Sequence, residues 1–226
     1  MAKCIRDTLK GGKGGGSGVG GGDCLNAKRD DASLTRSDRI SVYLYRGSIA
    51  ATGVLLILLS FTWLLHIAKV VSVINDAYLT LLLLLFYTTA GTSVFFLHLY
   101  IGKLHRFLKK LYFVSILCLA VLFILGAGSP VKQLSVSPLY LLLLVPLSVS
   151  IGSITAKEAF CFRIYEGYMI TFALPIFITA YSFGVFSQLG AALGITFISV
   201  LYVIFAIRKI ALPHHLDIGD KSAYTP

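Results

Sequence analysis

The stretch at residues 157–167, which reads KEAFCFRIYEG, gathers most of the residue types in this sequence that could do chemistry. It combines two carboxylates, two cations, one thiol and three aromatic rings. Such a mixture suits acid–base work, but it equally suits docking to a partner or to a lipid. If the stretch is helical, Glu158 and Phe162 share a face, and Arg163 pairs with Glu166. Alternatively, either glutamate pairs across the protein with Arg163 or with a second basic loop.

We interpret this stretch as a docking loop rather than as a catalytic centre. Cys161 lies between two phenylalanines and has no histidine neighbour in sequence, so it lacks a base that would activate its thiol. The two glutamates are the only acids between Asp76 and Asp217. Acids contribute little to membrane topology, so these two need another explanation. The predicted docking residues are Lys157, Glu158, Phe160, Cys161, Phe162, Arg163, Tyr165 and Glu166.

A second charged stretch, KLHRFLKK at residues 103–110, is basic enough to hold an anionic lipid or substrate head group. The alternative is that it serves only to set the membrane topology. Its candidate residues are Lys103, His105, Arg106, Lys109 and Lys110.

Histidine is the remaining candidate ligand. His98 and His105 are seven residues apart and would share a helix face if one helix continued past Gly102. His98 is therefore a candidate ligand for haem or for chlorophyll magnesium, and a hydrogen-bonded interfacial histidine is the alternative. His66 is a weaker candidate because it lies toward the other end of its span. The four cysteines form no CxxC pair, so no metal site is predicted.

Catalytic motifs are missing from the sequence. There is no GxSxG or HExxH pattern and no DxxD pair within a predicted span, and we expect no carboxylate inside a membrane span. Ion-coupled carriers usually need such a carboxylate, and hydrolases need a nucleophile with a base in reach. An enzyme is therefore disfavoured, and the sequence names no cofactor.

The elements that must position these residues are membrane-spanning helices. The chain is 57% hydrophobic and 13% charged, against about 25% charged in soluble domains. A run of roughly 18 apolar residues can cross about 30 Å of hydrocarbon as a helix. We therefore predict an all-α polytopic membrane protein with its transmembrane domain at 47–210 and a polar tail at 211–226. The six predicted spans are 47–68, 77–101, 111–128, 138–155, 167–186 and 189–207.

The distribution of cations predicts the orientation. With six spans, all of the twenty Lys and Arg except Lys69 and Lys132 fall on one side. Lys and Arg are retained on the cytoplasmic side of membranes, so both termini should face the cytoplasm, or the stroma in a plastid. The net charge of +10 is thus a topological signal with some attraction to lipid, and nucleic-acid binding is not expected.

Residues 1–46 form a separate polar tail whose centre reads GGKGGGSGVGGG. This glycine-rich basic segment should be a flexible coil, because ordering it costs backbone entropy and buries nothing. It is either the remnant of an organelle-targeting segment or a disordered leader.

Small residues and prolines give the packing cues. Gly190 and Gly194 form a GxxxG pair that favours close helix packing. Pro146 and Pro175 lie in mid-span positions and favour kinks. Two kinked helices could frame a path lined by Ser148, Ser150 and Thr171, or they could simply fit a bent bundle.

Two motifs carry a resemblance to a known family. The LYRGS entry at 44–48 and AKEAFCFRIYEG at 156–167 resemble an uncharacterised integral membrane protein family of cyanobacteria and plastids, over roughly residues 37–210. The resemblance implies a chloroplast protein of the thylakoid or envelope with its basic loops toward the stroma. It implies no activity.

We therefore expect a non-enzymatic scaffold, assembly or regulatory component that has the lipid bilayer and other membrane proteins as partners. The second hypothesis is a facilitator or channel for a small solute. A lipid- or pigment-modifying enzyme that uses the basic side is the third.

Overall fold

The computed structural model describes residues 36–68, 75–97 and 102–212. Within these ranges every regular element is a helix, which confirms the all-α prediction. Residues 1–35 of the predicted tail at 1–46, residues 213–226 of the predicted tail at 211–226, and His98 lie outside the described residues. The helices are α3 (Arg36–Ile67), α4 (Asp76–Phe95), α5 (Gly102–Leu125), α6 (Pro130–Val136), the 3-10 helix η1 (Pro138–Leu144), α7 (Val145–Phe162), α8 (Tyr165–Ser182) and α9 (Gln188–Ile210).

Five segments of the described chain are long and apolar enough to cross a membrane. The polytopic membrane fold is therefore confirmed. The predicted span at 167–186 corresponds to α8, which is not one of the five, so the count of six stays a prediction. The five are Ile40–Ile67, Asp76–Phe95, Leu104–Leu125, Pro138–Phe162 and Gln188–Ile210.

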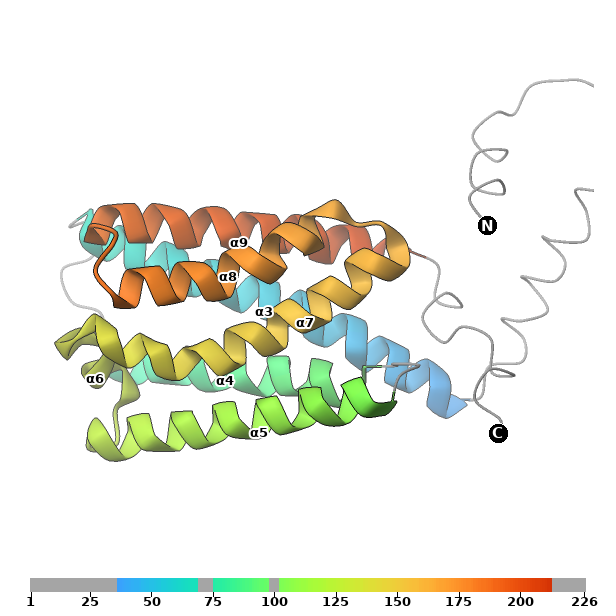
Figure 1. Cartoon of the computed structure of the whole chain (residues 1–226), viewed down its shortest axis with the longest axis horizontal. Coiled ribbons are helices and arrows are strands. Elements are labelled where there is room, and N and C mark those ends of the chain that lie inside the picture. Colours follow the sequence, from blue (N-terminus) through green and yellow to red (C-terminus); the bar gives the residue numbers. More distant parts are fainter. Residues whose placement is uncertain (1–35, 69–74, 98–101, 213–226) are drawn as a thin grey trace, which may run out of the picture.

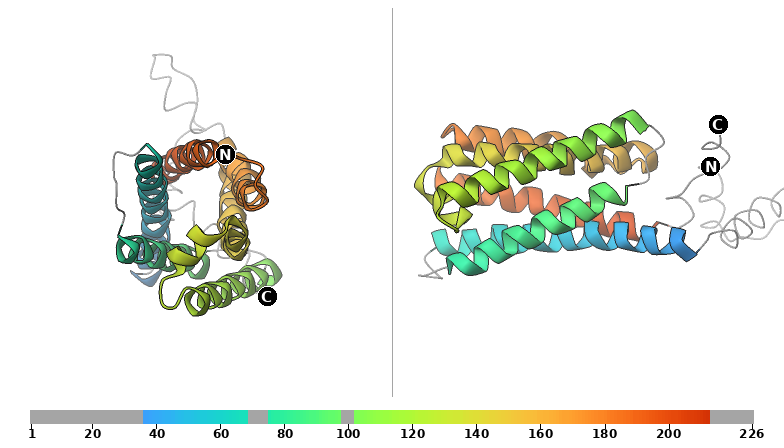
Figure 2. Two further views of the ribbon diagram at one scale, coloured as in Figure 1. Left: turned by 90° about the vertical axis from the view of Figure 1, so that its left-hand side faces the viewer. Right: turned by 90° about the horizontal axis from the view of Figure 1, so that it is seen from below.

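The long helices lie side by side along one axis, and α9 closes the bundle by packing against α3 (Figures 1 and 2). Contacts between neighbours fix their directions. Ser48 meets Ser93 at 2.8 Å and Thr52 meets Thr89 at 3.1 Å, so α3 and α4 run antiparallel. Arg46 of α3 bonds the carbonyl of Ile210, so the start of α3 and the end of α9 lie at the same end of the bundle.

The helix ends follow from local chemistry. The side chain of Asn75 caps α4 by accepting the N–H of Ala77 at 2.9 Å. Pro146 was expected to kink the middle of a span. It does lie inside the candidate span Pro138–Phe162, but in the first turn of α7, directly after η1, where a proline sacrifices no helical hydrogen bond. Pro175 does lie inside α8.

Both predicted charged loops are largely helical, which corrects the sequence analysis. The stretch 103–110 belongs to the first turns of α5, and residues up to Phe162 belong to α7. Only two residues join α7 to α8, and the first of them, Arg163, has a left-handed backbone (φ 55°). Residues 98–101 lie outside the described part of the chain, and α5 is described from Gly102, so the expectation that one helix carries both His98 and His105 stays a prediction.

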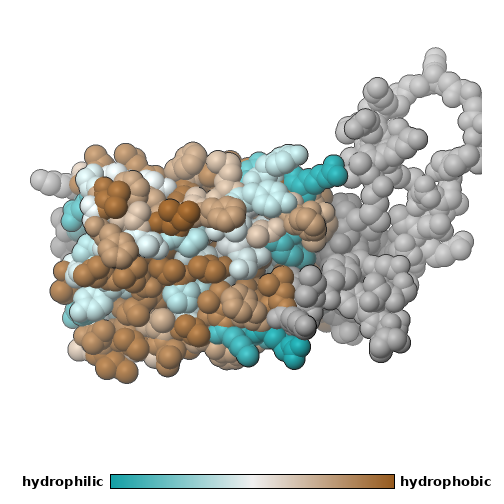
Figure 3. All heavy atoms as spheres, in the orientation of Figure 1, coloured by the Kyte–Doolittle hydropathy of each residue, from teal (hydrophilic) through white to brown (hydrophobic). Residues whose placement is uncertain are grey.

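The outer surface is mostly apolar along the length of the helices (Figure 3). Hydrophilic atoms gather at the right-hand end of that view, where the link from α7 to α8 lies. A lipid-facing belt with one polar end is the surface expected of a membrane bundle.

Candidate functional site

A buried carboxylate lies at the polar end of the bundle. Glu158, in the last turns of α7, has no exposed surface, and it belongs to the candidate span Pro138–Phe162. The expectation that no carboxylate lies inside a span is therefore wrong. The sequence analysis ended the predicted span at residue 155 and placed Glu158 in a loop. In the structure α7 extends to Phe162, and the Glu158 side chain points into the bundle.

Three helices supply the partners of Glu158. The hydroxyl of Tyr45, on α3, donates to Oε1 at 2.6 Å, and Nζ of Lys157 donates to the same oxygen at 2.8 Å. Nζ of Lys209, near the end of α9, forms an ion pair with Oε2 at 2.5 Å. We call Tyr45, Lys157, Glu158 and Lys209 the ion cluster. Both oxygens of the carboxylate are thus engaged by side chains of the chain itself.

Aromatic rings surround the two lysines. Nζ of Lys209 lies 3.9 Å from the centroid of the Phe162 ring and 5.9 Å from that of Tyr45. Nζ of Lys157 lies 5.8 Å from the Tyr45 ring. Cation–π attraction is strongest where water is excluded, and Lys209 is fully buried. Glu158 and Phe162 therefore face the same lysine, as expected if their stretch is helical.

Arg46 extends the cluster to the end of α9. Its side chain is buried and donates to the carbonyls of Ile210, at 3.3 Å, and of Leu212. The last carbonyls of a helix have no partner within the helix and carry partial negative charge. A buried guanidinium satisfies them without water, so Arg46 fastens α3 to the end of α9.

Glu166 has a different partner from the one predicted. Its two oxygens accept from Arg208 at 2.6 and 2.8 Å, and Arg163 is not involved. Arg163 lies outside both helices in its left-handed conformation, so the three-residue spacing of a continuous helix does not apply. The Arg208 side chain is 56% exposed, and an exposed pair of this kind contributes little to stability.

The predicted docking loop therefore divides into two faces. Lys157 and Glu158 point into the bundle, and Phe162 is partly buried beside them. The outward face consists of Phe160, Cys161, Arg163 and Tyr165, all of them exposed. We call these four residues the outer face.

The basic stretch on α5 does not join the ion cluster. No ion pair among the described residues connects it to Glu158 or Glu166. Arg106 and Lys110 are exposed, and Lys109 lies 5.6 Å from the centroid of the Phe95 ring. His105 is partly buried, and the side chain of Lys103 lies outside the described part of the chain.

The GxxxG pair has one residue at a helix contact. A Cβ at Gly194 would overlap the ring of Phe177 on α8, so α8 and α9 approach closely there. Gly190 is exposed, and a Cβ there would meet only its own capping residue, Ser187, at 3.2 Å. Of the two glycines, Gly194 is therefore the one that allows α9 to pack closely against α8.

The hydroxyls expected along a solute path are bonded within the protein. Ser148 donates to the carbonyl of Val145, and Ser150 donates to that of Pro146. Thr171 donates to the carbonyls of Gly152 and Gly167. Ser148 and Ser150 thus donate within α7, and Thr171 joins α8 to α7, so the proton of each of the three hydroxyls is used within the protein.

Metal chemistry finds no support among the described residues, where no group of three His, Cys, Asp or Glu side chains is placed to hold an ion.

Three members of the buried network were not singled out from the sequence: Tyr45, Arg46 and Lys209. Arg46 directly precedes residues 47–68, which contain no Asp, Glu, Lys or Arg. Lys209 lies two positions after residues 167–207, the last stretch without these residues. A Lys or Arg at the edge of a span is expected there simply because it sets the membrane topology. Its position in the sequence does not show whether its side chain points into the bundle or toward solvent. Glu158 was the signal from which the cluster could have been inferred, because a carboxylate at the membrane edge needs a cation as its partner.

The comparisons with known proteins agree with this architecture. No curated protein and no solved structure matches the chain. Residues 92–225, more than half of the chain and including Glu158 and Lys209, match the model of the family described as Uncharacterized integral membrane protein (DUF2301). The helical spans with their buried ion cluster therefore belong to a member of this family of integral membrane proteins.

Proposed function

We propose that this chain is a non-catalytic scaffold, assembly or regulatory component of a membrane complex. The observation that carries the proposal is the state of Glu158, whose two oxygens are engaged by Tyr45, Lys157 and Lys209 while the side chain has no exposed surface. An ionisable group inside a membrane is a functional candidate by default. Here the charge serves to hold three helices together.

Two properties distinguish Glu158, as a structural carboxylate that links helices, from a catalytic or transport carboxylate. A general acid or base must reach its substrate, either directly or through one water molecule. Glu158 is enclosed instead, and two cations with a phenol occupy its oxygens. Contacts of this kind between three helices suit a rigid platform for partners.

The outer face is the proposed docking surface. Phe160 and Tyr165 are 79% and 71% exposed at the polar end, with Arg163 between them in sequence. Aromatic residues and arginine are the types enriched in protein contacts and at membrane interfaces. Phe160 lies in the last turn of α7, Tyr165 is the first residue of α8, and Arg163 lies in the two-residue link between these helices, beside the ion cluster.

Co-purification in mild detergent tests this proposal. A stoichiometric partner should be recovered with the wild type and lost with the Phe160→Ala/Tyr165→Ala double variant. Phe172→Ala is the matched control, because Phe172 is 65% exposed on α8 but lies away from the link. Recovery of the chain alone or only as a homo-oligomer, or a partner that the double variant retains, would contradict the proposal.

We further propose that α8 is a sixth span and that the polar end faces the cytoplasm or stroma. An odd number of crossings would put the start of α3 and the end of α9 on opposite sides, yet Arg46 bonds the carbonyl of Ile210. A sixth crossing removes this conflict. α8 also lies along α9, since Gly167 approaches Phe205 and Gly194 approaches Phe177.

Thiol labelling in sealed vesicles tests this topology. In a chain with Cys161 as its only cysteine, a membrane-impermeant maleimide should label from the cytoplasmic or stromal side. A Val185→Cys variant without the native cysteines should label from the opposite side, because Val185 is exposed in the turn between α8 and α9 and is separated from Cys161 by α8 alone. Labelling of both from one side would exclude six crossings.

A plastid membrane, either thylakoid or envelope, is the proposed location. The basic glycine-rich segment at 1–46 and the family resemblance support it. Residues 1–46 fused to a fluorescent reporter should carry it into chloroplasts, and a reporter that stays in the cytosol would count against this location.

A further inference from the structure

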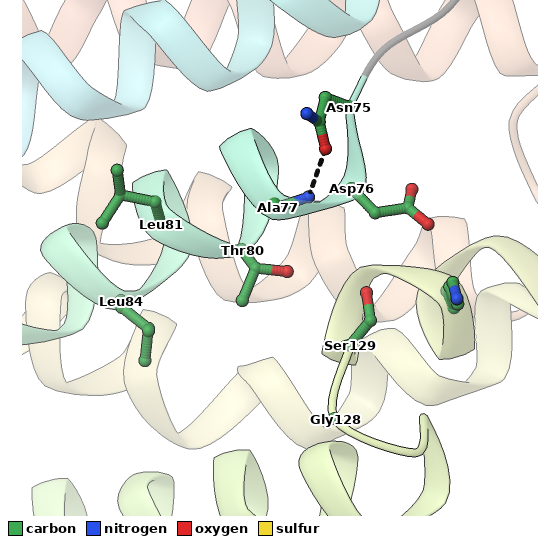
Figure 4. Close-up of a pocket in the computed structure, with 9 residues that line it drawn as sticks. Asn75, Asp76, Ala77, Thr80, Leu81, Leu84, Gly128 and Ser129 are labelled. Carbon is green, nitrogen blue, oxygen red and sulfur yellow. Dashed lines mark hydrogen bonds between the residues drawn. The ribbon is translucent and has the colours of Figure 1, made fainter.

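The end of the bundle opposite the ion cluster carries a groove of about 480 Å³ between the start of α4 and the segment 128–132 (Figure 4). Its polar lining consists of Asn75, Asp76, Thr80, Ser129 and Lys132. Its apolar lining consists of Ala77, Leu81 and Leu84 on α4, together with Gly128. None of these residues takes part in the site described above.

Two hydroxyls in the groove have no hydrogen-bond partner. The Oγ1 atom of Thr80 and the Oγ atom of Ser129 are buried atoms without a partner among the described residues. Figure 4 shows both hydroxyls in the space between α4 and the segment that carries Ser129. Buried polar atoms in folded proteins are nearly always bonded, by protein groups or by water, so two such atoms at one groove mark it as a place that can bind polar groups.

The turn after α5 is built to hold Ser129 in place. Gly128 has a φ of 93°, a conformation that glycine adopts readily, and its N–H donates to the carbonyl of Phe123 at 3.0 Å. The N–H of Ser129 donates to the carbonyl of Gly126 at 3.0 Å. The hydroxyl of Ser129 is therefore presented by a closed turn.

The charges around the groove specify a zwitterion. Lys132, the amide of Asn75 and the two hydroxyls can all donate, and the positive end of the α4 dipole lies beside them. This set suits a phosphate. Asp76 is the one carboxylate in the lining, and it would repel a purely anionic ligand but attract an ammonium group.

The lining also changes from polar to apolar along α4. From Asn75 to Thr80 the helix rises about 7.5 Å, which matches the roughly 5–8 Å of head-group layer on each side of a bilayer. Leu81 and Leu84 follow, and they are 55% and 37% exposed. A ligand with a polar head and an apolar tail fits this order.

We propose that the groove binds a zwitterionic phospholipid head group, a phosphate with a primary ammonium, in the leaflet opposite the ion cluster. Thr80, Ser129 and Lys132 hold the phosphate, and Asp76 holds the ammonium. The first acyl segment lies against Leu81 and Leu84.

Native mass spectrometry of the purified full chain tests the proposal with added phosphatidylethanolamine and phosphatidylglycerol of identical acyl chains. The wild type should prefer phosphatidylethanolamine. Each lost hydrogen bond to a charged phosphate should weaken binding by about tenfold or more, so Thr80→Val/Ser129→Ala should lose most of the bound lipid. Asp76→Asn should remove the preference between the two lipids.

Ser135→Ala is the matched control, because Ser135 lies on α6 with its hydroxyl already bonded to the carbonyl of Val131. It should bind lipid like the wild type. Thr80→Ser keeps the hydroxyl and should retain binding, which separates loss of the ligand contact from loss of the fold.

Chain-free phosphoethanolamine completes the test and should bind far more weakly than the lipid. Binding as tight as that of the lipid would identify a soluble ligand and overturn the lipid assignment. The proposal would also be overturned by equal binding of both lipids to the wild type, or by unchanged binding in the double variant.

Discussion

The two ends of the bundle treat polar groups in opposite ways. At the polar end, charged side chains turn inward and meet partners from three helices, as Glu158 does with Tyr45, Lys157 and Lys209. At the other end, the hydroxyls of Thr80 and Ser129 lie in a groove without partners. The first arrangement is complete within the chain, whereas the second is complete only with a ligand.

The difference teaches where stability and binding reside. A buried ion pair is held in place because separating it strands a charge in a medium of low polarity. An unpartnered buried hydroxyl costs stability until something bonds it. Substitutions should therefore damage the fold at the polar end and leave it intact, or improve it, at the groove.

The largest effect is expected from Glu158→Ala, because it leaves Lys209 charged, fully buried and without its carboxylate. Breaking a buried pair costs about 3–5 kcal/mol, which denaturant unfolding in detergent would measure. Glu166→Ala is the control, since its pair with Arg208 is exposed and should cost less than about 1 kcal/mol. The neutral pair Glu158→Leu/Lys209→Leu should recover most of the loss. Equal losses at Glu158 and Glu166 would remove the distinction between the two pairs.

Tyr45→Phe should have the next largest effect. It removes one hydroxyl, and with it a 2.6 Å hydrogen bond to a buried carboxylate, while the ring stays beside both lysines. Hydrogen bonds to charged groups contribute about 1.5–3 kcal/mol. The same unfolding measurement checks this value, with Tyr43→Phe as the control because Tyr43 is 62% exposed. Matching stabilities of the two variants would show that the phenol does not hold Glu158.

Glycine substitutions compare the packing of the two ends. A Cβ at Gly167, near the polar end, would lie 2.6 Å from the carbonyl oxygen of Thr155 and 2.9 Å from Cβ of Ala159. Forcing α7 and α8 apart should cost about 1–3 kcal/mol. Gly190→Ala, at the other end, meets only Ser187 Oγ at 3.2 Å and should change stability by less than about 1 kcal/mol. Thermal unfolding of both variants decides whether the contact of α7 with α8 at Gly167 limits stability in a way that the exposed position Gly190 does not.

The smallest effect is expected from Thr80→Val in lipid-free detergent. The substitution replaces an unpartnered buried hydroxyl by a methyl group of similar size, so stability should rise by up to about 1 kcal/mol. Ser48→Ala is the contrasting change, since Ser48 bonds Ser93 at 2.8 Å and its loss should lower stability. A clear loss of stability in Thr80→Val without lipid would mean that the hydroxyl already has a partner.

Much of the fold was predictable because lipid imposes a simple rule. Charges are costly in hydrocarbon, so the uncharged runs located the helices, and the structure has a helix within each run. The helix ends were less predictable. The charged stretches at 103–110 and 157–162 read as loops, but helices can extend beyond the hydrocarbon, and both stretches are helical.

The site was predictable in part. Glu158 was singled out because an acid there had no topological purpose, and Phe162 was placed on its face by helical spacing. Tyr45 and Lys209 were not found, because sequence spacing does not say which distant helices are neighbours. The predicted pairing of Arg163 with Glu166 failed for a local reason, since the left-handed backbone of Arg163 ends α7 between them.

The ion cluster also sets an order of events during synthesis. The ribosome makes Tyr45 first, then Lys157 and Glu158, and Lys209 almost at the end of the last helix. Until α9 is inserted, Oε2 of Glu158 lacks its ion pair with Lys209, and α3 has no α9 carbonyls for Arg46 to bond. The ion cluster is therefore complete only when the chain is complete. A product that stops before Lys209 would leave Oε2 of Glu158 without its ion-pair partner. Quality-control proteases could recognise this defect.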